Sequence, residues 1–262
     1  MNLGFSHRGT RSIQRIALVL CGTVALAGCG VPAARPLRVG TNLWPGYEPA
    51  YLARHAGYFS SDEVQLLDFT SSSEVIRAYR NGLIDVAALT GDEVLKVCSN
   101  QPEHRVILVC DYSNGADVLL AKPEIATLAD LKGRRVGVET TVLGAYMLGR
   151  ALESAGLGPS DVTVVNVPLL EHVQAYTEGR VDAIVTFEPH RSHLLDAGAH
   201  LLFDSTRIPG EIVDLLITRP ELPRELGAPL DKFISAWLRA VDDMARDPAA
   251  AAWKARSPGA PT

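Results

Sequence analysis

Two short catalytic motifs are absent from the 262-residue sequence, which has neither a Gly-x-Ser-x-Gly nucleophile elbow nor a glycine-rich phosphate loop. Only His190 and His193, three positions apart near Glu188, have a spacing that could ligate a metal. We interpret that pair as part of a solvated helix face, with a metal site as the alternative. The remaining mid-chain histidines are scattered and predicted to lie on the surface: His55, His104, His172 and His200. We predict no enzymatic activity, no metal and no cofactor.

Cysteine is scarce, with 4 residues, of which Cys98 and Cys110 lie in the body of the chain. Cys98 lies near the end of a helix predicted to begin at Thr90, whereas Cys110 ends the strand that returns from that helix. Several residues of strand rise, at about 3.3 Å each, exceed the Cα separation that a disulfide tolerates. We therefore expect two buried thiols rather than a disulfide.

The sequence contains no apolar run long enough for a permanent membrane-spanning helix, but it begins like an exported protein. Three arginines precede the apolar run of residues 16–28, which has the length of a signal-peptide core. The run ends in Leu26-Ala27-Gly28-Cys29, which resembles a bacterial lipobox. We expect residues 1–28 to be a signal peptide, Cys29 to carry the lipid and residues 29–36 to form a tether on the periplasmic or extracellular face of the cell envelope. A plain secretory signal with an incidental Cys29 is the alternative.

Positive charge is also in short supply. The leader holds three of the 25 basic residues and none of the 30 acidic ones, so 22 basic residues remain against 30 acidic, a net charge of −8. Such a surface is a poor partner for nucleic acid. We expect a monomer whose partners are a small molecule and other proteins.

Strand and helix patterns alternate along the chain, which predicts an α/β fold with parallel strands. The first set has strands at 37–41, 64–69, 84–89 and 105–111 and helices at 47–57, 73–81 and 91–99. The second set has strands at 117–122, 135–139, 162–167, 181–187 and 201–204 and helices at 143–155, 170–178 and 189–197. A strand at 211–218 then returns to the first set, and a helix at 231–246 follows. We predict two lobes joined by two crossing segments: 37–112 plus 211–247, and 113–210, with a frayed tail at 248–262.

Unusual turns follow several of these strands at their carboxyl ends. Residues 40–49, GTNLWPGYEP, place two aromatics and a carboxylate directly after the first strand. Polar turns follow the next strands at residues 70–72, 90–92, 140–141 and 187–188. Ligands of open α/β sheets bind beyond the carboxyl ends of the strands. The two lobes are therefore expected to face each other across a ligand cleft.

Four segments resemble the substrate-binding proteins of ABC importers in the nitrate, sulfonate, taurine and thiamine-pyrimidine (NMT1/THI5-like) group. They are LRVGTNLWPGYEPAYLARHAGYF, GLIDVAALTGDEVL, LADLKGRRVGVETTVLGAYMLGRALESAGL and GRVDAIVTFEP. The resemblance implies a two-lobe type II periplasmic-binding-protein fold, in which ligand is trapped by hinge closure and passed to a permease. Our hinge candidates are residues 112–115 and 208–210.

The resemblance also implies which residues contact the ligand. They are Trp44, Tyr47, Glu48, Thr70, Ser71, Thr90, Gly91, Asp92, Leu143, Gly144, Tyr146, Phe187 and Glu188. Sulfonate- and taurine-type members usually carry a Gly-Ser-Ser-like turn where this chain has Val142-Leu143-Gly144, and hydroxyls at a helix N-terminus favour oxyanions. The acidic and aromatic residues suit an amine or aminopyrimidine instead. The ligand classes considered are thus amines, aminopyrimidines and sulfonates.

Each of these residues also has a structural interpretation. Ser71 with Glu74 and Thr90 with Glu93 match capping boxes, and Asp92 and Glu188 are acids at helix starts. Trp44 and Tyr47 would suit a loop that closes the core, and Tyr146 suits a helix core.

Two other functions are compatible with the same sequence. One is a lipid-anchored ligand sensor without transport. The other is a relative of enzymes that form the thiamine pyrimidine, although those relatives carry a Cys-rich run and this chain has no Cys after Cys110.

Overall fold

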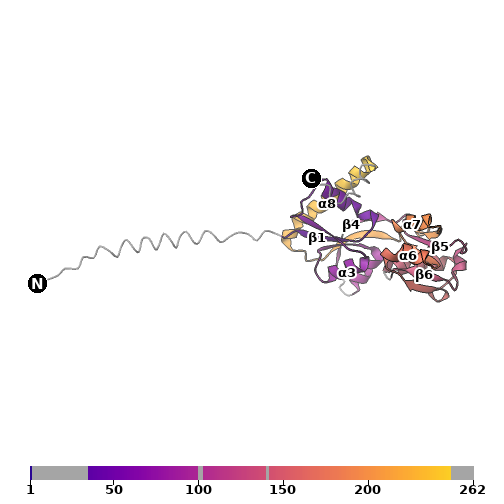
Figure 1. Cartoon of the computed structure of the whole chain (residues 1–262). Helices are drawn as coiled ribbons and strands as arrows, with labels where there is room; N and C mark the ends of the chain where they lie inside the picture. Colours follow the sequence, from indigo (N-terminus) through magenta and orange to yellow (C-terminus); the bar gives the residue numbers. More distant parts are fainter. Residues whose placement is uncertain (2–34, 100–102, 140–141, 249–262) are drawn as a thin grey trace. The chain divides into compact units, whose positions relative to one another are not determined.

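The computed structural model describes Met1 and residues 35–99, 103–139 and 142–248. The predicted signal peptide, Cys29, most of the tether and most of the tail lie outside the described residues. From Pro36 onward the chain forms one compact unit (Figure 1). In the part of the chain that the structure describes, no helix combines the length and apolar character needed to cross a membrane.

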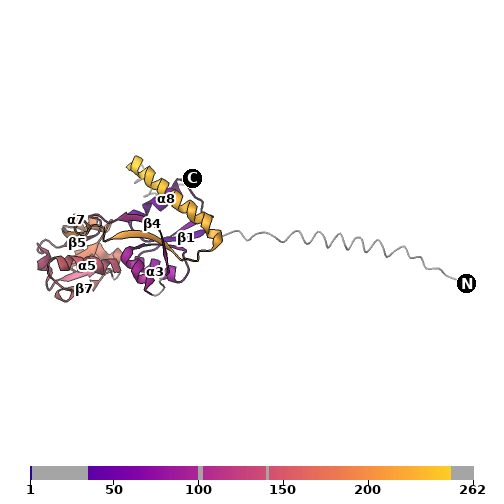
Figure 2. The ribbon, with the colours of Figure 1, turned by 180° about the vertical axis from the view of Figure 1, so that it is seen from behind.

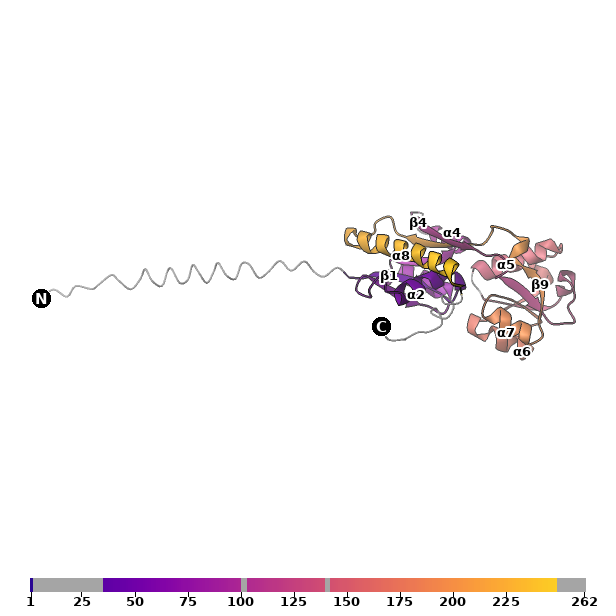
Figure 3. The same ribbon diagram turned by 90° about the horizontal axis from the view of Figure 1, so that it is seen from above.

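The first lobe is built on a five-stranded sheet with strand order β2-β1-β3-β10-β4. Its strands are β1 (Leu37–Thr41), β2 (Val64–Asp68), β3 (Val86–Thr90), β4 (Arg105–Tyr112) and β10 (Val213–Thr218). Helices α2 (Glu48–His55) and α8 (Gly227–Arg246) pack on one face around Trp237 and Phe233, and Figure 3 shows them close together. Helices α3 (Ser72–Arg80) and α4 (Gly91–Cys98) cover the other face. Because both faces are covered, β1 and β3 are almost wholly buried, and β3 is apolar up to its last residue, Thr90.

The second lobe repeats this plan with strand order β7-β6-β8-β5-β9. Its strands are β5 (Val118–Ala121), β6 (Arg135–Val138), β7 (Thr163–Asn166), β8 (Ala183–Thr186) and β9 (His200–Asp204). Helix α5 (Val142–Ser154) packs on one face, and α6 (His172–Thr177) and α7 (His190–Asp196) pack on the other (Figure 2). Short 3₁₀ helices occupy Pro45–Tyr47, Leu128–Leu131, Pro159–Asp161, Leu169–Glu171, Ser205–Arg207 and Arg224–Leu226.

Both sheets are mixed, whereas the sequence pattern predicted parallel strands. β1 pairs in parallel with β2 and β3, as β6 does with β7 and β8. β10 is antiparallel to β3 and β4, and β5 is antiparallel to β8 and β9. The reason is the double crossing: β5 and β10 each enter their sheet from the other lobe, so they run against its βαβ strands. Hydrophobic periodicity does not reveal that direction.

Two segments cross between the lobes, residues 113–117 and 205–212, and hydrogen bonds join them. The Oγ atoms of Ser113 and Ser205 lie 2.8 Å apart, and Ser205 Oγ also accepts from the Gly115 amide at 2.7 Å. Gly115 and Gly210 have φ angles of +83° and +74°, which residues with a Cβ rarely adopt. Each predicted hinge window therefore contains a glycine in the left-handed region. Hinge motion itself remains a prediction.

Cys98 and Cys110 are free thiols, and both are half-buried rather than buried. Cys110 belongs to β4, the edge strand of its sheet, and Cys98 ends α4. An edge strand and a helix end leave one side open, which explains the partial exposure.

Candidate ligand-binding site

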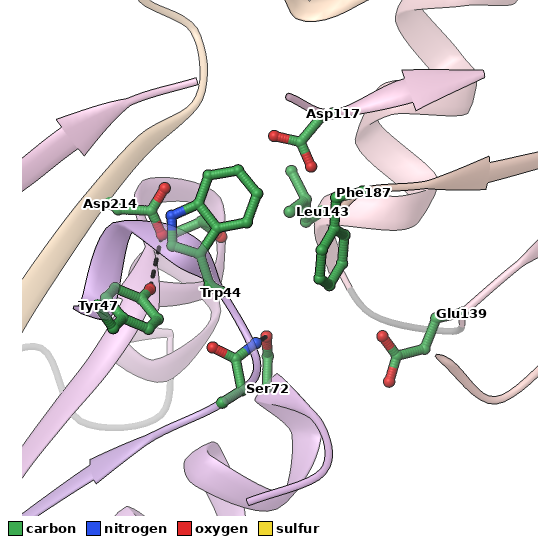
Figure 4. A pocket seen from close by; sticks show the side chains of 10 residues that line it. Trp44, Tyr47, Ser72, Asp117, Glu139, Leu143, Phe187 and Asp214 are labelled. Atoms are coloured by element: carbon green, nitrogen blue, oxygen red, sulfur yellow. Dashed lines mark hydrogen bonds between the residues drawn. The ribbon is translucent and has the colours of Figure 1, made fainter. Parts of the chain in front are cut away.

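A pocket lies between the lobes, beyond the carboxyl ends of the parallel strands (Figure 4). Its cavity volume is about 20 Å³, and the empty space around it, which includes open solvent, is about 350 Å³. The first sheet and its loops contribute Asn42, Trp44, Tyr47, Ser72, Thr90 and Asp214; the second lobe and its crossing segment contribute Asp117, Glu139, Leu143 and Phe187. The cleft expected from the strand order is therefore present.

Trp44 forms the contact between the two walls. Pro45 begins a 3₁₀ turn and holds the preceding Trp44 in an extended conformation, with φ −139° and ψ 129°. The indole meets the ring of Phe187 edge to face, with centroids 5.5 Å apart and planes at 77°. Its Nε1 donates to Asp111 Oδ2 at 3.2 Å. The indole is thus oriented by a first-lobe carboxylate and stacked against the second lobe.

Tyr47 packs in the first-lobe core and also lines the pocket. Its ring is only 2% exposed and belongs to the first-lobe core. Its hydroxyl donates to Asp214 Oδ1 at 2.6 Å (Figure 4). Burial, followed by the nearby Asp214 charge, raises the pKa of the Tyr47 hydroxyl well above its ordinary value. Tyr47 therefore remains a neutral donor that holds one oxygen of Asp214.

Acidic residues dominate the polar lining. Burial raises the pKa of Asp117 to about 6 and that of Glu139 to about 7. Burial and the neighbouring Asp111 raise the pKa of Asp214 well above its usual range. Oδ1 of Asn42, Oδ2 of Asp117 and Oδ2 of Asp214 are buried and have no hydrogen-bond partner among the described residues. None of the described lining residues is a Lys or Arg.

Five of the thirteen predicted contact residues line the pocket: Trp44, Tyr47, Thr90, Leu143 and Phe187. The side chain of Glu93 bonds back to the Thr90 amide at 3.1 Å, as the capping-box interpretation predicted. Thr90 therefore begins α4 and lines the cleft as well.

The other eight lie outside the described lining: Glu48, Thr70, Ser71, Gly91, Asp92, Gly144, Tyr146 and Glu188. Ser71 Oγ accepts from the Glu74 amide at 3.3 Å, and Glu74 accepts from the amide and hydroxyl of Thr70. Ser71 therefore caps α3 as the structural interpretation expected, but Glu74 bonds back to Thr70 and not to the Ser71 amide, so the capping box is incomplete. Gly91 and Asp92 begin α4, and Gly144 lies in the first turn of α5.

Of the remaining predicted residues, Glu188 and Tyr146 are held by local partners, and Glu48 lies in a different hollow. Glu188 accepts from Arg191 Nη1 at 2.9 Å and from Ser192, both in the first turn of α7. Tyr146 donates its hydroxyl to Glu211. Glu48 lines a separate first-lobe hollow with Tyr51, Asp68, Phe69, Asn42, Leu43 and Trp44.

Sequence reasoning did not select five of the lining residues: Asn42, Ser72, Asp117, Glu139 and Asp214. Asn42 Nδ2 donates to Ser72 Oγ at 2.9 Å, which ties the turn after β1 to α3. Of these five residues, Asp214 was the easiest to recognise from the sequence, because it is the one charged residue in the strand Val213–Thr218. A carboxyl placed in a buried strand is costly and indicates a function.

His172 is buried, which contradicts its predicted surface position. Its ring nitrogens lie 2.9 Å from Thr186 Oγ1 and 3.2 Å from the Val167 carbonyl, and burial lowers its pKa to about 4. The ring packs edge-on against His190 with centroids 5.9 Å apart, and His190 is itself buried, which contradicts its predicted place on a solvated helix face. Within residues 35–99, 103–139 and 142–248, no three His, Cys, Asp or Glu side chains are grouped as a metal site requires.

The raised carboxyl pKa values predict that the protein without ligand loses stability as pH rises. Glu93 and Glu139 have pKa values of about 7 when folded, against an ordinary value of 4.5, and Asp117 has about 6. Between about pH 5 and 7 the folded state therefore binds protons that the unfolded state has lost, so raising the pH favours unfolding. His172 and His190, whose pKa values burial lowers, act in the opposite direction but are outnumbered by Glu93, Glu139, Asp117 and Asp214.

Melting temperatures of the ligand-free protein at pH 5.5 and 7.5 check this. We expect the value at pH 7.5 to be lower by about 2–4 °C for each net kcal/mol of stability lost. Glu139→Gln removes one of these groups and is expected to shrink the difference. A protein that melts higher at pH 7.5 than at pH 5.5 would contradict the assignment of these carboxyls as buried and protonated.

A family model described as NMT1/THI5 like matches residues 44–251. The chain is 25% identical over 164 residues to the taurine-binding periplasmic protein of Escherichia coli (strain K12), which covers 62% of this chain and 51% of that protein. It is 27% identical over 162 residues to the putative aliphatic sulfonates-binding protein of the same organism, covering 56% of this chain and 47% of that protein. The matched segment spans about half the length of these relatives.

The alkanesulfonate-binding protein SsuA of Xanthomonas axonopodis pv. citri, solved with bound MOPS, has a similar structure. Its TM-score is 0.73 at 21% identity, covering 85% of this chain and 79% of that one. At this identity the likeness concerns the fold alone, and it confirms the predicted two-lobe periplasmic-binding-protein architecture.

Proposed function

Because the chain belongs to the NMT1/THI5-like family, we propose that it is the extracytoplasmic solute-binding component of an ABC importer. The observation that carries this proposal is the pocket lined by both lobes, with Trp44 of one lobe stacked on Phe187 of the other. Two crossing segments with left-handed glycines suit opening and closing around a solute. The protein would capture a small organic molecule and deliver it to a permease.

The two relatives are described as binding taurine and aliphatic sulfonates, whereas the lining of this chain favours amines or aminopyrimidines. Leu143 gives the second-lobe wall an apolar side chain where an oxyanion would need a hydroxyl. The proposed function therefore includes sulfonates, amines and aminopyrimidines as ligand classes. Both curated relatives named above are described as binding proteins, so we propose binding without a chemical step.

We further propose that Cys29 anchors the mature protein to a membrane as a monomer, on the periplasmic or extracellular face. A lipid-anchored sensor would use the same pocket and the same two crossings. Genes for a permease and an ATPase beside the gene for this chain would support import, and their absence would support sensing.

A thermal-shift panel tests the proposed function. The panel contains alkanesulfonates, taurine, nitrate, primary amines and aminopyrimidines. A ligand present at a hundred times its dissociation constant stabilises the folded state by about 2.7 kcal/mol, which corresponds to roughly 5–10 °C for a chain of this size. We expect at least one class to produce such a shift. A cooperative melt that no compound displaces would contradict a solute-binding role.

A further inference from the structure

The carboxyl groups of the interlobe pocket come from three different elements. Asp214 lies in β10, Asp117 immediately precedes β5, and Glu139 immediately follows β6. All three line the same pocket, where Figure 4 shows the Asp214 carboxyl beside the Tyr47 hydroxyl. Asp117 and Asp214 are each only 2% exposed. The topology thus brings the three acids to one place from distant parts of the chain.

Several buried oxygen atoms in the interlobe pocket have no hydrogen-bond partner among the described residues. Tyr47 occupies one oxygen of Asp214, but Oδ2 of Asp214 and Oδ2 of Asp117 are buried with no hydrogen-bond partner among the described residues. Oδ1 of Asn42 is a third such atom in the pocket lining. Buried polar atoms without partners are rare in folded proteins, and each calls for a missing donor. Three of them in one pocket indicate a ligand with several N–H or O–H donors.

The surrounding charge is negative. The negative charges of Asp111, Asp117 and Glu93 raise the pKa of Asp214. Those of Asp111 and Asp92 raise the pKa of Asp117. The charged neighbour that acts on Glu139 is Glu74. No Lys, Arg or His is found among the described lining residues. Buried carboxylates without a counter-charge are strongly unfavourable, so protons or a cation must neutralise them.

We propose that the pocket takes an organic cation with at least two N–H donors, a primary ammonium or an amidinium, held by Asp117 and Asp214. The apolar part of the ligand lies against Trp44 and Phe187, whose rings suit a flat or short aliphatic group. This inference rests on the proposed function and narrows its ligand to one class. An anion would face three acids and no cation among the described lining residues, and a quaternary ammonium has no donor for the unused oxygens.

Binding of such a cation depends on pH in a defined direction. In the free protein the raised pKa values keep part of the cluster protonated near neutral pH, and the cation must displace those protons. The affinity for an amine is therefore expected to rise from pH 5.5 to pH 8 and to level off above the raised pKa values. The titratable groups that interact electrostatically around the pocket are all acids except for the neutral Tyr47. They are Asp92, Glu93, Asp111, Asp117, Glu139 and Asp214, with Glu74 beside Glu139.

Matched sets of probes test the proposal on the purified protein by calorimetric titration at pH 8. One set is benzylamine, benzyl alcohol and phenylmethanesulfonate; the other is n-butylamine, 1-butanol and 1-butanesulfonate. We expect an amine to bind, and its alcohol and sulfonate to bind at least about tenfold more weakly, the value of one charge-assisted bond. Binding of a sulfonate in preference to both amines would overturn the cation inference while leaving the solute-binding role intact. No binding by any amine would overturn it as well.

Amide variants locate the interaction. Asp214→Asn and Asp117→Asn keep side-chain size, and the new amide oxygen of Asp214→Asn still accepts from the Tyr47 hydroxyl. We expect each variant to weaken amine binding about ten- to a hundredfold. Asp196→Asn changes an exposed residue on α7 and the net charge by the same amount, and is expected to bind as the wild type does.

A second measurement separates a ligand role from a structural one. A carboxylate that served only the fold would lower the melting temperature when replaced, whereas removing an unpaired buried acid is expected to keep or raise it in the ligand-free protein. Unchanged amine affinity in both amide variants, or equal weakening in Asp196→Asn, would overturn the proposal.

Discussion

Trp44→Ala is expected to weaken ligand binding about 100-fold or more while leaving the protein folded. The indole supplies the flat surface between Asp111 and Phe187, at the point where the two lobes touch. Its loss removes apolar contact of about 1.5–3 kcal/mol and, for a cationic ligand, an attraction of about 0.5–2 kcal/mol. Trp44 lies in a loop and is only half-buried, so the free energy of unfolding should change little. Calorimetric titration and thermal melting of the variant measure both effects.

Leu43→Ala is the matched control for this variant. Leu43 is the neighbouring residue of the same turn, is 44% exposed, and lines the first-lobe hollow but not the interlobe pocket. The Leu43→Ala variant should bind ligand as the wild type does. If the two variants lost affinity equally, the effect would belong to the turn as a whole and not to the indole. Wild-type affinity in Trp44→Ala would exclude the pocket as the ligand site.

Trp237→Ala is expected to produce the largest loss of stability, about 3–5 kcal/mol. Trp237 is 1% exposed on α8 and packs edge-on against Phe233, with centroids 6.0 Å apart; Phe233 meets Phe59 in the same way at 5.9 Å. The cavity left behind lies between α8, α2 and the first sheet. For a chain of this size, the melting temperature should fall by roughly 10 °C.

The adjacent residue gives the control for that prediction. Leu238 is 52% exposed on the same helix, and Leu238→Ala should change the free energy of unfolding by about 0.5 kcal/mol or less. Equal melting temperatures for Trp237→Ala and the wild type would mean that α8 contributes little to the first lobe. That result would contradict the core described here.

The fold could be predicted from the sequence because its signals are local. Apolar strands such as β3, with all five residues buried, and amphipathic helices such as α3 follow directly from side-chain periodicity. The antiparallel direction of β10 could not be predicted in this way, because it depends on which lobe the chain leaves. His172 was misplaced because its buried partners, Thr186 and Val167, come from elements that the sequence does not place beside it.

The site was predicted in part, and the failures have a common physical cause. Trp44 and Phe187 follow strand ends in conspicuous turns, and both line the pocket. Glu188 also follows a strand, but Arg191 and Ser192, three and four positions later, satisfy its carboxylate locally. Asp117 and Asp214 gave weaker signals, because their significance appears only when the second crossing brings them together. A local sequence pattern identifies candidate site residues, but it does not show which residues they contact in the folded protein.

A crystal structure of the protein grown with benzylamine at pH 8 tests the central claim most directly. The account predicts one molecule between the lobes, with its nitrogen within hydrogen-bonding distance of Asp117 and Asp214 and its ring against Trp44 and Phe187. Benzylamine bound instead in the first-lobe hollow at Glu48 and Asp68, or an interlobe pocket that holds only water at saturating benzylamine, would contradict it.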